Sequence, residues 1–446
     1  MKVYPVLFLL FSGLAWGQHN NRSARDLQFR FSNPGARSLG FGGAFIGLAD
    51  DATSPVANPA GMSRIAKRSA SLELNYNRTE NDIPYAAGAI QQTNLFEFDY
   101  NFQGSSAPES MFQVPYLAAV FPSGRWRFAV FTHQQANLKR NYDTSLIPIC
   151  NIGSNFYPDC GTNAQTNFGP GTDTLRMEIL NLGGSIGVAL SEKFSIGLSL
   201  FTSELDYQAD SVSDVIRSTR TVRVQKLAYG KDRDLGGIAG LLWKATEELS
   251  LGLTYKFQPE FTYTAELTKD GPLTNTPDDF VTEALFKVPD AISFGLSINP
   301  VDQATLNLDA NRVFYSEITD ELLDYTLGMT VTTAGTIVQT MPDVTEIHVG
   351  FEWIFANLAT PLSFRLGYWH DPYHAATNNV DDSQILVGDA DDPNVRDIFF
   401  LHLFEQDQDH YSLGLGWTFG QKLQMDLAFE SSDSNRNGTV SGIYRF

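Results

Sequence analysis

Long apolar runs are missing from this 446-residue chain once its amino-terminal segment is passed. No later stretch approaches the roughly 18 consecutive apolar residues of a membrane-spanning helix, which excludes inner-membrane helices. Basic clusters are missing too, because 31 Lys and Arg residues stand against 51 Asp and Glu residues and give a formal charge of −20. A nucleic-acid partner requires grouped positive charge, so we expect none.

The chain carries the short motifs of catalysis and cofactor binding nowhere in the setting that their chemistry requires. Its one Gly-x-Ser-x-Gly match, Gly183-Gly184-Ser185-Ile186-Gly187, lies inside an expected strand, whereas the hydrolase elbow is a turn from a strand into a helix. The glycines near the amino terminus follow no strand and lack the spacing of a dinucleotide fingerprint. His370 and His374 are four residues apart, but they lie in a Pro-containing segment without the helical metal-site motif. We therefore expect no enzyme, no cofactor and no metal site.

Cysteine is scarce, with Cys150 and Cys160 as the only two. Both lie in one long loop rich in Asn, Gly and Pro. In an exported protein such a close pair indicates a disulfide, which would stabilise the loop by about 2–3 kcal/mol. No other thiol and no nearby His completes a metal or redox site.

The first residues predict a secretory signal at positions 1–17. Lys2 supplies a positive charge, Val6 to Leu14 form a short apolar run, and Ala15-Trp16-Gly17 is a small-x-small cleavage site before Gln18. No Cys follows the cut, so we do not expect a lipid anchor. The mature protein is therefore expected to be exported.

Alternation of apolar and polar residues is abundant between 69 and 446, where about fourteen segments read as β-strands. Six short turns alternate with seven generally longer connections. Strands that are apolar on one face and polar on the other, repeated so often, predict an all-β fold: a closed transmembrane antiparallel barrel. Because the strand count is even, the first strand begins and the last strand ends on the periplasmic side, where the short turns lie. The last residue is aromatic, Phe446. The expected strands are Ser69 to Arg78, Met111 to Phe121, Arg125 to Gln134, Leu175 to Leu190, Phe194 to Tyr207, Leu235 to Lys244, Leu249 to Tyr263, Thr282 to Ile298, Ala304 to Tyr315, Val344 to Ile354, Leu362 to Trp369, Tyr411 to Phe419, Leu423 to Phe429 and Val440 to Phe446.

Charged residues at inward positions of these strands are expected to face the lumen. On the lipid face each would cost about 2–4 kcal/mol near the midplane. Most should form ion pairs along the lumen wall, and Arg127, Lys256 and Arg365 are also candidate ligand contacts by this parity alone. The inward set is Arg127, Lys256, Asp309, Glu352, Arg365 and Asp426.

Residues 18–68 precede the first strand and do not alternate. They are rich in small residues and contain Asn-Pro, which suits a compact plug where backbone approaches backbone closely. Apolar residues such as Leu39 and Ile46 argue against a disordered tail. The residues assigned to this hatch motif are Gly40, Gly42, Gly43, Asp50, Asp51, Asn58, Pro59 and Ala60, with Phe41 and Phe45 as further candidate ligand contacts.

The run from Ala36 to Met62, with its Leu-Gly-x-Gly-Gly-Ala, Ala-Asp-Asp-Ala and Asn-Pro-Ala-Gly elements, resembles the hatch of the FadL-type outer-membrane transporters. That resemblance implies a fourteen-stranded monomeric barrel in the bacterial outer membrane, surrounded by lipid and lipopolysaccharide. It implies passive uptake of a hydrophobic molecule: capture among the outer loops, a lumen pocket, movement of the hatch, and lateral exit through the wall. The third expected strand, Arg125 to Gln134, departs from the family because it contains no Gly or Pro to make the kink beside that exit.

Two other readings stay open. A barrel of the same family could instead bind a partner in a secretion or surface-attachment system, with the acidic segment Asp381 to Asp397 as docking site. An outer-membrane hydrolase is a third reading, to be tested at His133, His348 and His410.

Overall fold

A computed structural model describes residues 31, 33–92, 98–150, 166–217, 220–270, 280–320, 338–374, 377–379 and 407–446. The expected signal peptide and the acidic segment 381–397 lie outside these residues. The helices are α2 (Ala36–Gly40), α3 (Ser54–Ala57), η1 (Pro59–Arg64) and α4 (Ser316–Asp320). The strands are β1 (Ser69–Gln92), β2 (Phe98–Ser123), β3 (Trp126–Thr144), β4 (Ile147–Cys150), β5 (Thr166–Ala189), β6 (Phe194–Arg217), β7 (Arg220–Lys244), β8 (Leu249–Phe257), β9 (Glu260–Lys269), β10 (Phe280–Lys287), β11 (Ala291–Val301), β12 (Ala304–Val313), β13 (Val338–Thr340), β14 (Val344–Phe355), β15 (Leu362–Asp371), β16 (Thr377–Asn379), β17 (Gln408–Phe419), β18 (Leu423–Ser431) and β19 (Asn435–Arg445).

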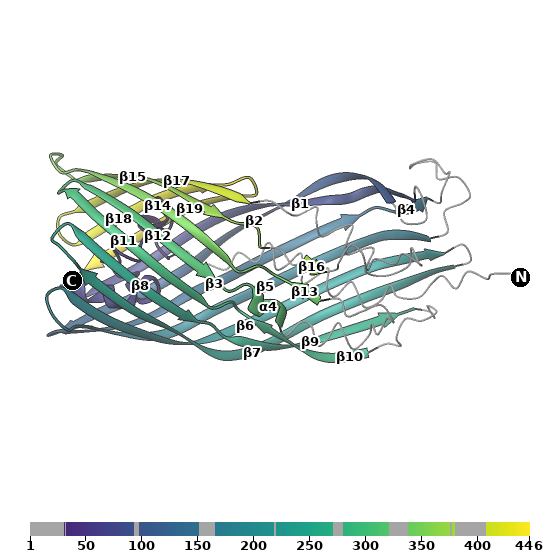
Figure 1. Cartoon of the computed structure of the whole chain (residues 1–446), viewed down its shortest axis with the longest axis horizontal. Coiled ribbons are helices and arrows are strands. Elements are labelled where there is room, and N and C mark those ends of the chain that lie inside the picture. Colours follow the sequence, from purple (N-terminus) through teal and green to yellow (C-terminus); the bar gives the residue numbers. More distant parts are fainter. Residues whose placement is uncertain are drawn as a thin grey trace, which may run out of the picture.

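The strands form a closed antiparallel barrel with fourteen strands around its wall, as predicted. Two of the fourteen barrel strands are interrupted. The first consists of β8 and β9, which both pair with β7. The second consists of β10, which pairs with β9, and β11, which pairs with β8. Closure occurs where β1 pairs with β19, from Ser69↔Arg445 to Thr79↔Asn435. The barrel runs the length of Figure 1, with the chain's carboxyl end at the edge that carries the short turns.

The outer face carries the apolar half of the alternation. On β6, for example, Ile196, Leu198 and Leu200 are exposed while Ser195 and Ser199 are buried. Exposed aromatic residues such as Trp126 and Trp243 lie near the short turns, as expected of a barrel's interfacial girdle. No helix among the described residues is long and apolar enough to span a membrane.

Several strands continue far beyond the predicted segments. On β6 the outward residues change from Leu200 to Glu204 and Asp206, which pair with Arg233 (2.6 Å) and Lys231 (2.8 Å) of β7. This change from apolar to charged marks the lipid boundary, because unshielded charge on the lipid face is costly. The predicted strand ends near this boundary, so the polar continuation to Arg217 was missed.

The turn between the expected strands that end at Ile298 and begin at Ala304 is shorter than predicted. Residues 299–301 form the end of β11, and Val301 pairs with Ala304 across the tight turn that follows. Pro300 is tolerated there because the pairing shifts register between Ile298 and Val301, so no ladder hydrogen bond is lost at that residue.

The third strand of the barrel, β3, contains a β-bulge in a segment without Gly or Pro. Its pairing with β5 skips Gln135, and four successive residues from His133 to Ala136 are buried. A β-bulge adds one unpaired residue and bends a strand, so a kink at this place requires neither Gly nor Pro. Pairing of β3 with β2 ends at this point, at Tyr116↔His133.

Cys150 ends β4, is buried against Ala89, and is disulfide-bonded. Cys160 lies outside the described residues. The structure therefore supports the expected disulfide at Cys150, and its pairing with Cys160 stays a prediction.

Candidate functional site

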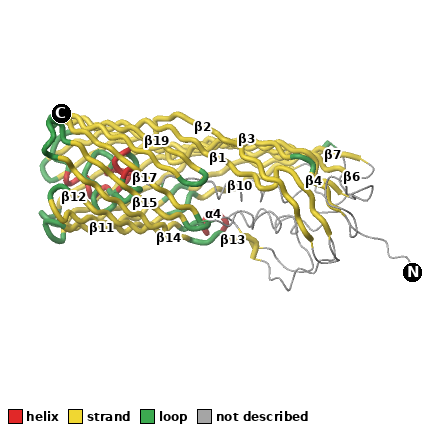
Figure 2. The backbone as a smooth tube through the Cα atoms, turned by 90° about the horizontal axis from the view of Figure 1, so that it is seen from above, coloured by secondary structure: helices red, strands yellow, loops and turns green. Residues whose placement is uncertain are grey.

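Residues 33–68, which we call the plug, pack inside one end of the barrel. Nearly all of them are buried, and their three short helices are enclosed by strands in Figure 2. Their polar contacts reach walls on opposite sides: the Ala36 N–H donates to Ser441 of β19 (3.2 Å), and the Ser199 hydroxyl of β6 donates to the Pro55 carbonyl (2.6 Å). The first strand begins at Ser69, directly after the plug.

Glycines of the wall let the plug backbone touch the strands. A Cβ built on any of them would overlap plug atoms: Gly197 meets the Pro59 carbonyl carbon, and Gly367 meets the Gly42 nitrogen. Only a residue without a side chain permits this approach. The glycines placed this way are Gly187, Gly197, Gly240, Gly252, Gly295, Gly350 and Gly367, on seven strands from β5 to β15.

A carboxylate of the wall holds the turn at the centre of the plug. One oxygen of Asp309, on β12, accepts hydrogen bonds from the Phe45 N–H (2.6 Å) and the Ile46 N–H (2.8 Å). Hydrogen bonds to an ionised acceptor are stronger than neutral ones. The neighbouring Asn307 amide donates to the Ala44 carbonyl (2.9 Å). This inward aspartate therefore serves plug docking.

The motif glycines occupy the turn after α2. Gly42 has a φ of +65° and lies against the Tyr368 backbone, where a Cβ would be 2.7 Å from the Tyr368 nitrogen. Its N–H donates to Ser412 (3.1 Å) and its carbonyl accepts from Nδ1 of His348 (2.6 Å). Gly43 also has positive φ, and a Cβ on Gly40 would be 3.2 Å from the Cα of Gly414.

The two motif aspartates form an ion-pair cluster within the plug. Arg37 contacts both Asp50 and Asp51, the latter at 3.3 Å, and Asp51 also accepts hydrogen bonds from the Thr53 N–H and hydroxyl. Although burial opposes the shift, the Arg37 guanidinium lowers the pKa of Asp50, whereas burial raises the pKa of Asp51. The cluster ties α2 to the turn before α3.

Asn58, Pro59 and Ala60 begin the 3-10 helix η1. Asn58 Oδ1 accepts from the Ala60 N–H (3.1 Å), which caps the helix, and Pro59 occupies its first position. The Asn58 amide also donates to Ile46 (3.0 Å) within the plug and to Leu241 (3.1 Å) on β7. One side chain thus joins the cap, the central turn and the wall.

Replacing Asn58 with Ala should loosen the plug by about 1–3 kcal/mol, because a cap and two buried carbonyl partners are lost together. Limited trypsin digestion of the protein in mild detergent should then cut faster at Arg64. Asn58→Asp keeps the capping oxygen but turns a carboxylate toward two carbonyl oxygens, so it should be cut at least as fast. A wild-type digestion rate for Asn58→Asp would show that the amide donors do not hold the plug.

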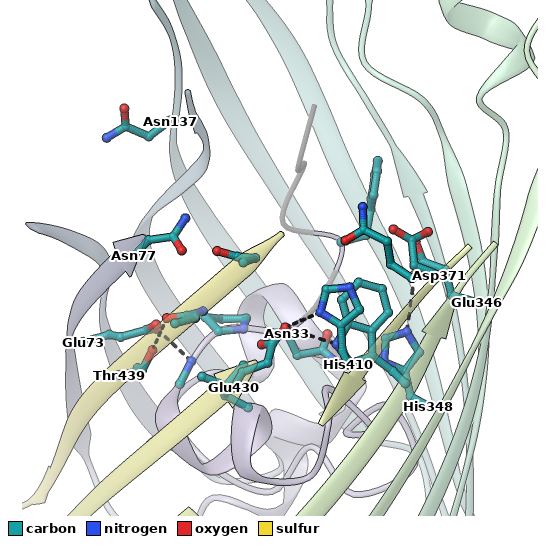
Figure 3. A pocket seen from close by; sticks show the side chains of 18 of the residues that line it. Asn33, Glu73, Asn77, Asn137, Glu346, His348, Asp371, His410, Glu430 and Thr439 are labelled. Carbon is teal, nitrogen blue, oxygen red and sulfur yellow. Dashed lines mark hydrogen bonds and ion pairs between the residues drawn. The ribbon is translucent and has the colours of Figure 1, made fainter. Parts of the chain in front are cut away.

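A cavity lies next to the plug on its lumen side and offers about 120 Å³ to the centres of water-sized molecules. One side is polar and is formed by β1, β14, β15 and β17–β19. Figure 3 shows this side chain by side chain. Its titratable residues are Glu73, Glu346, His348, Asp371, His374, His410 and Glu430.

A stacked ladder of three rings lines the polar side. Trp369 stacks on His348 (5.1 Å between ring centroids) and on His410 (3.7 Å), since the three residues are cross-strand partners on β14, β15 and β17. Each imidazole contacts a carboxylate: His348 meets Glu346 at 3.3 Å and His410 meets Glu430 at 2.8 Å. The ladder thus presents aromatic faces and charged edges together.

The other side of the cavity is apolar. Phe31, Leu138 and Tyr315 line it and belong to a large buried apolar cluster made by inward residues of β3, β5–β7 and β9–β12. The cavity is therefore amphipathic, with an apolar lumen continuing from one wall. Such a cavity suits a molecule with an apolar body and a polar end.

The residues predicted to contact a ligand face inward, but they do not line this cavity. Arg127 donates to the Ile65 carbonyl (2.6 Å), and Lys256 donates to the Phe31 carbonyl (2.9 Å). Arg365 is bound by Glu352 and Asp426, each at 2.7 Å. Phe41 and Phe45 are wholly buried within the plug. The predicted lumen ion pair of Arg365 is present, whereas ligand contacts for the five residues stay a prediction.

The residues that line the cavity were not predicted from the sequence. His348 lies on the same strand face as Glu352, so parity alone could have included it. Asn137 lies beyond the end of the expected strand Arg125 to Gln134, whereas Gln113 lies inside an expected strand and carries no charge that would have singled it out. No group of three or more His, Cys, Asp or Glu residues among those described could hold a metal ion.

Comparisons with known proteins agree with this architecture. The sequence model described as outer membrane protein transport protein (OMPP1/FadL/TodX) matches residues 31–392. A FadL homologue from Pseudomonas aeruginosa superposes with a TM-score of 0.65 at 15% identity, covering 94% of this chain and 100% of that one. The toluene transporters TbuX of Ralstonia pickettii (0.56, 16%, 93% and 99%) and TodX of P. putida (0.55, 13%, 93% and 99%) are also similar. No curated protein matches the chain.

Proposed function

Because the chain belongs to the OMPP1/FadL/TodX family of outer-membrane transport proteins, we propose that it carries hydrophobic small molecules passively across the outer membrane through the cavity described above. The observation that supports this proposal best is the position of the cavity. It lies between the plug, the apolar lumen and the place where two strands of the wall separate. The relatives named as toluene transporters make an uncharged or weakly polar aromatic cargo the starting hypothesis.

The separation of strands supplies an exit. Backbone pairing of β2 with β3 runs only from Ser123↔Trp126 to Tyr116↔His133. Beyond it, residues 98–115 of β2 and 134–144 of β3 pair with β1 and β5 and not with each other. We call this part of the wall the β2–β3 gap. A ligand leaving here enters the membrane sideways without crossing the plug.

In the part of the chain that the structure describes, side chains span the β2–β3 gap near the cavity. The Asn137 amide donates to Gln113 (3.0 Å), and both residues line the cavity. A hydrogen bond between two side-chain amides contributes about 1 kcal/mol to stability, which is far less than the many backbone hydrogen bonds of a continuous strand pair contribute together. We infer that this amide pair opens to release the ligand.

Linking Gln113→Cys to Asn137→Cys with a short bifunctional thiol reagent should abolish protein-dependent uptake of toluene, and a reducible reagent should make the loss reversible. Uptake is measured with labelled toluene in cells or vesicles with and without the protein. The pair Thr254→Cys and Ser293→Cys is the matched control, because these residues are direct partners in the continuous β8–β11 pairing, face inward and do not line the cavity. Full uptake after complete linkage at 113 and 137 would eliminate the lateral route, and equal uptake with and without the protein would eliminate transport.

A further inference from the structure

Acidic groups outnumber basic groups in the cavity beside the plug. Four carboxylates and three imidazoles line it, and neither Lys nor Arg is among its described lining residues. Even if every imidazole were protonated, one negative charge would remain, and with neutral imidazoles there would be four. Lys256 reaches the Phe31 carbonyl from outside the lining, and the inward residues Arg140 and Lys226 lie elsewhere in the lumen.

Two buried acceptors in the cavity, on Asn33 and His410, have no hydrogen-bond partner among the described residues. Asn33 is 6% exposed and uses its amide on the Gly43 carbonyl, which leaves Oδ1 without a donor. His410 is 2% exposed and uses Nδ1 on Glu430, which leaves Nε2. When Nδ1–H donates to the carboxylate, Nε2 of the neutral ring is an acceptor. A buried acceptor left unsatisfied is destabilising, so both atoms indicate a donor group that belongs there.

These two acceptors lie among carboxylates, so all of these groups would contact the same end of a bound ligand. Figure 3 shows Asn33 and His410 between Glu73 on one side and Asp371 and Glu346 on the other. The stacked rings around Trp369 add electron-rich faces, and such faces attract cations. The opposite wall is apolar. A fatty-acid anion would bring its charge against carboxylates here.

We propose that this cavity selects apolar molecules whose polar end donates hydrogen bonds, in particular alkylammonium or arylammonium ions, and disfavours carboxylates. The inference rests on the transport function proposed above, because it names the cargo of the same cavity. The ammonium lies among Asn33 Oδ1, His410 Nε2 and the surrounding carboxylates, and the hydrocarbon part extends toward Leu138 and the apolar lumen.

Equilibrium binding of three ligands with the same chain tests this selection. Dodecylammonium, dodecanol and dodecanoate are titrated onto the full-length protein in mild detergent at pH 7.5, with Trp fluorescence as the readout because Trp369 lines the cavity. We expect the ammonium to bind at least tenfold more tightly than the carboxylate, with the alcohol between them. In Glu430→Gln and in Asp371→Asn this preference should fall several-fold, while dodecanol affinity should change little.

Two controls separate folding from selectivity. Glu247→Gln removes an exposed carboxylate at a short turn and should keep the full preference. Asp371 is partly exposed at the end of β15, so Asp371→Asn keeps the test usable if Glu430→Gln does not fold. Saturable binding of all three ligands with equal affinity, or tighter binding of dodecanoate, overturns the proposed selection but leaves transport intact. If none of the three ligands binds saturably, the proposed selection is overturned, while transport is decided separately by the toluene uptake experiment.

Discussion

Gly197→Val is expected to displace the plug and make the outer membrane permeable to large hydrophilic antibiotics. The added side chain would occupy the space of the Pro59 carbonyl carbon and the Ala60 nitrogen. Backbone cannot withdraw as a flexible side chain can, and overpacking of this kind costs about 1–3 kcal/mol or more. Cells that produce the variant should become several-fold more sensitive to vancomycin than cells that produce the wild-type protein.

The matched control is Gly442→Val on β19. A Cβ at Gly442 meets nothing within 4 Å, and the residue lies in the same kind of continuous strand. This variant should retain wild-type antibiotic resistance and equal amounts of folded barrel. If Gly197→Val is folded and just as impermeable as Gly442→Val, the close contact of wall and plug does not seal the lumen.

Arg365→Met is expected to destabilise the folded barrel strongly. Arg365, Glu352 and Asp426 have side chains that are only 2%, 3% and 0% exposed, and the guanidinium also lies 5.8 Å from the centre of the Phe41 ring. Removing the cation leaves two buried carboxylates without their partner, which costs about 3–5 kcal/mol. The midpoint of urea unfolding, followed by the gel mobility of unheated samples, should fall accordingly.

Two further variants test this explanation. Arg233 pairs with Glu204 at the exposed outer face, where a pair contributes only about 0–1 kcal/mol, so Arg233→Met should unfold almost like the wild type. Arg365→Met combined with Glu352→Leu and Asp426→Leu should recover much of the loss, because buried ion pairs can often be replaced by packed apolar residues. A loss of equal size in the triple variant would show that packing, and not unpaired charge, is responsible.

The barrel could be predicted from the sequence because alternation alone decides which residues face lipid. Leu413 and Leu415 alternate with glycines on β17, and the same parity placed Arg365 and Asp426 inward. The hatch motif was likewise visible as small residues around Asn58. These features depend on neighbours close in sequence, where periodicity carries the information.

The cavity could not be predicted in the same way, because it depends on alignment across strands. His348, Trp369 and His410 stack only because β14, β15 and β17 pair in one register, and that register follows from hydrogen bonds between distant segments. The β2–β3 gap begins at two irregularities, the bulge at Gln135 of β3 and the register shift of β2 between Gln113 and Tyr116, and Pro115 is the one local sign of either. The amphipathic cavity can therefore be identified only from the folded barrel and not from the sequence.

The height of β6 has a consequence for where cargo is collected. Its 24 residues measure roughly 80 Å at about 3.3 Å each, whereas the hydrocarbon core of a bilayer is about 30 Å thick. The charged stretch that starts at Glu204 therefore extends beyond the hydrocarbon core into water. Compounds meet this charged part of the barrel before they reach any acyl chain. Uptake should therefore follow the dissolved concentration of a compound and not the amount already partitioned into the membrane.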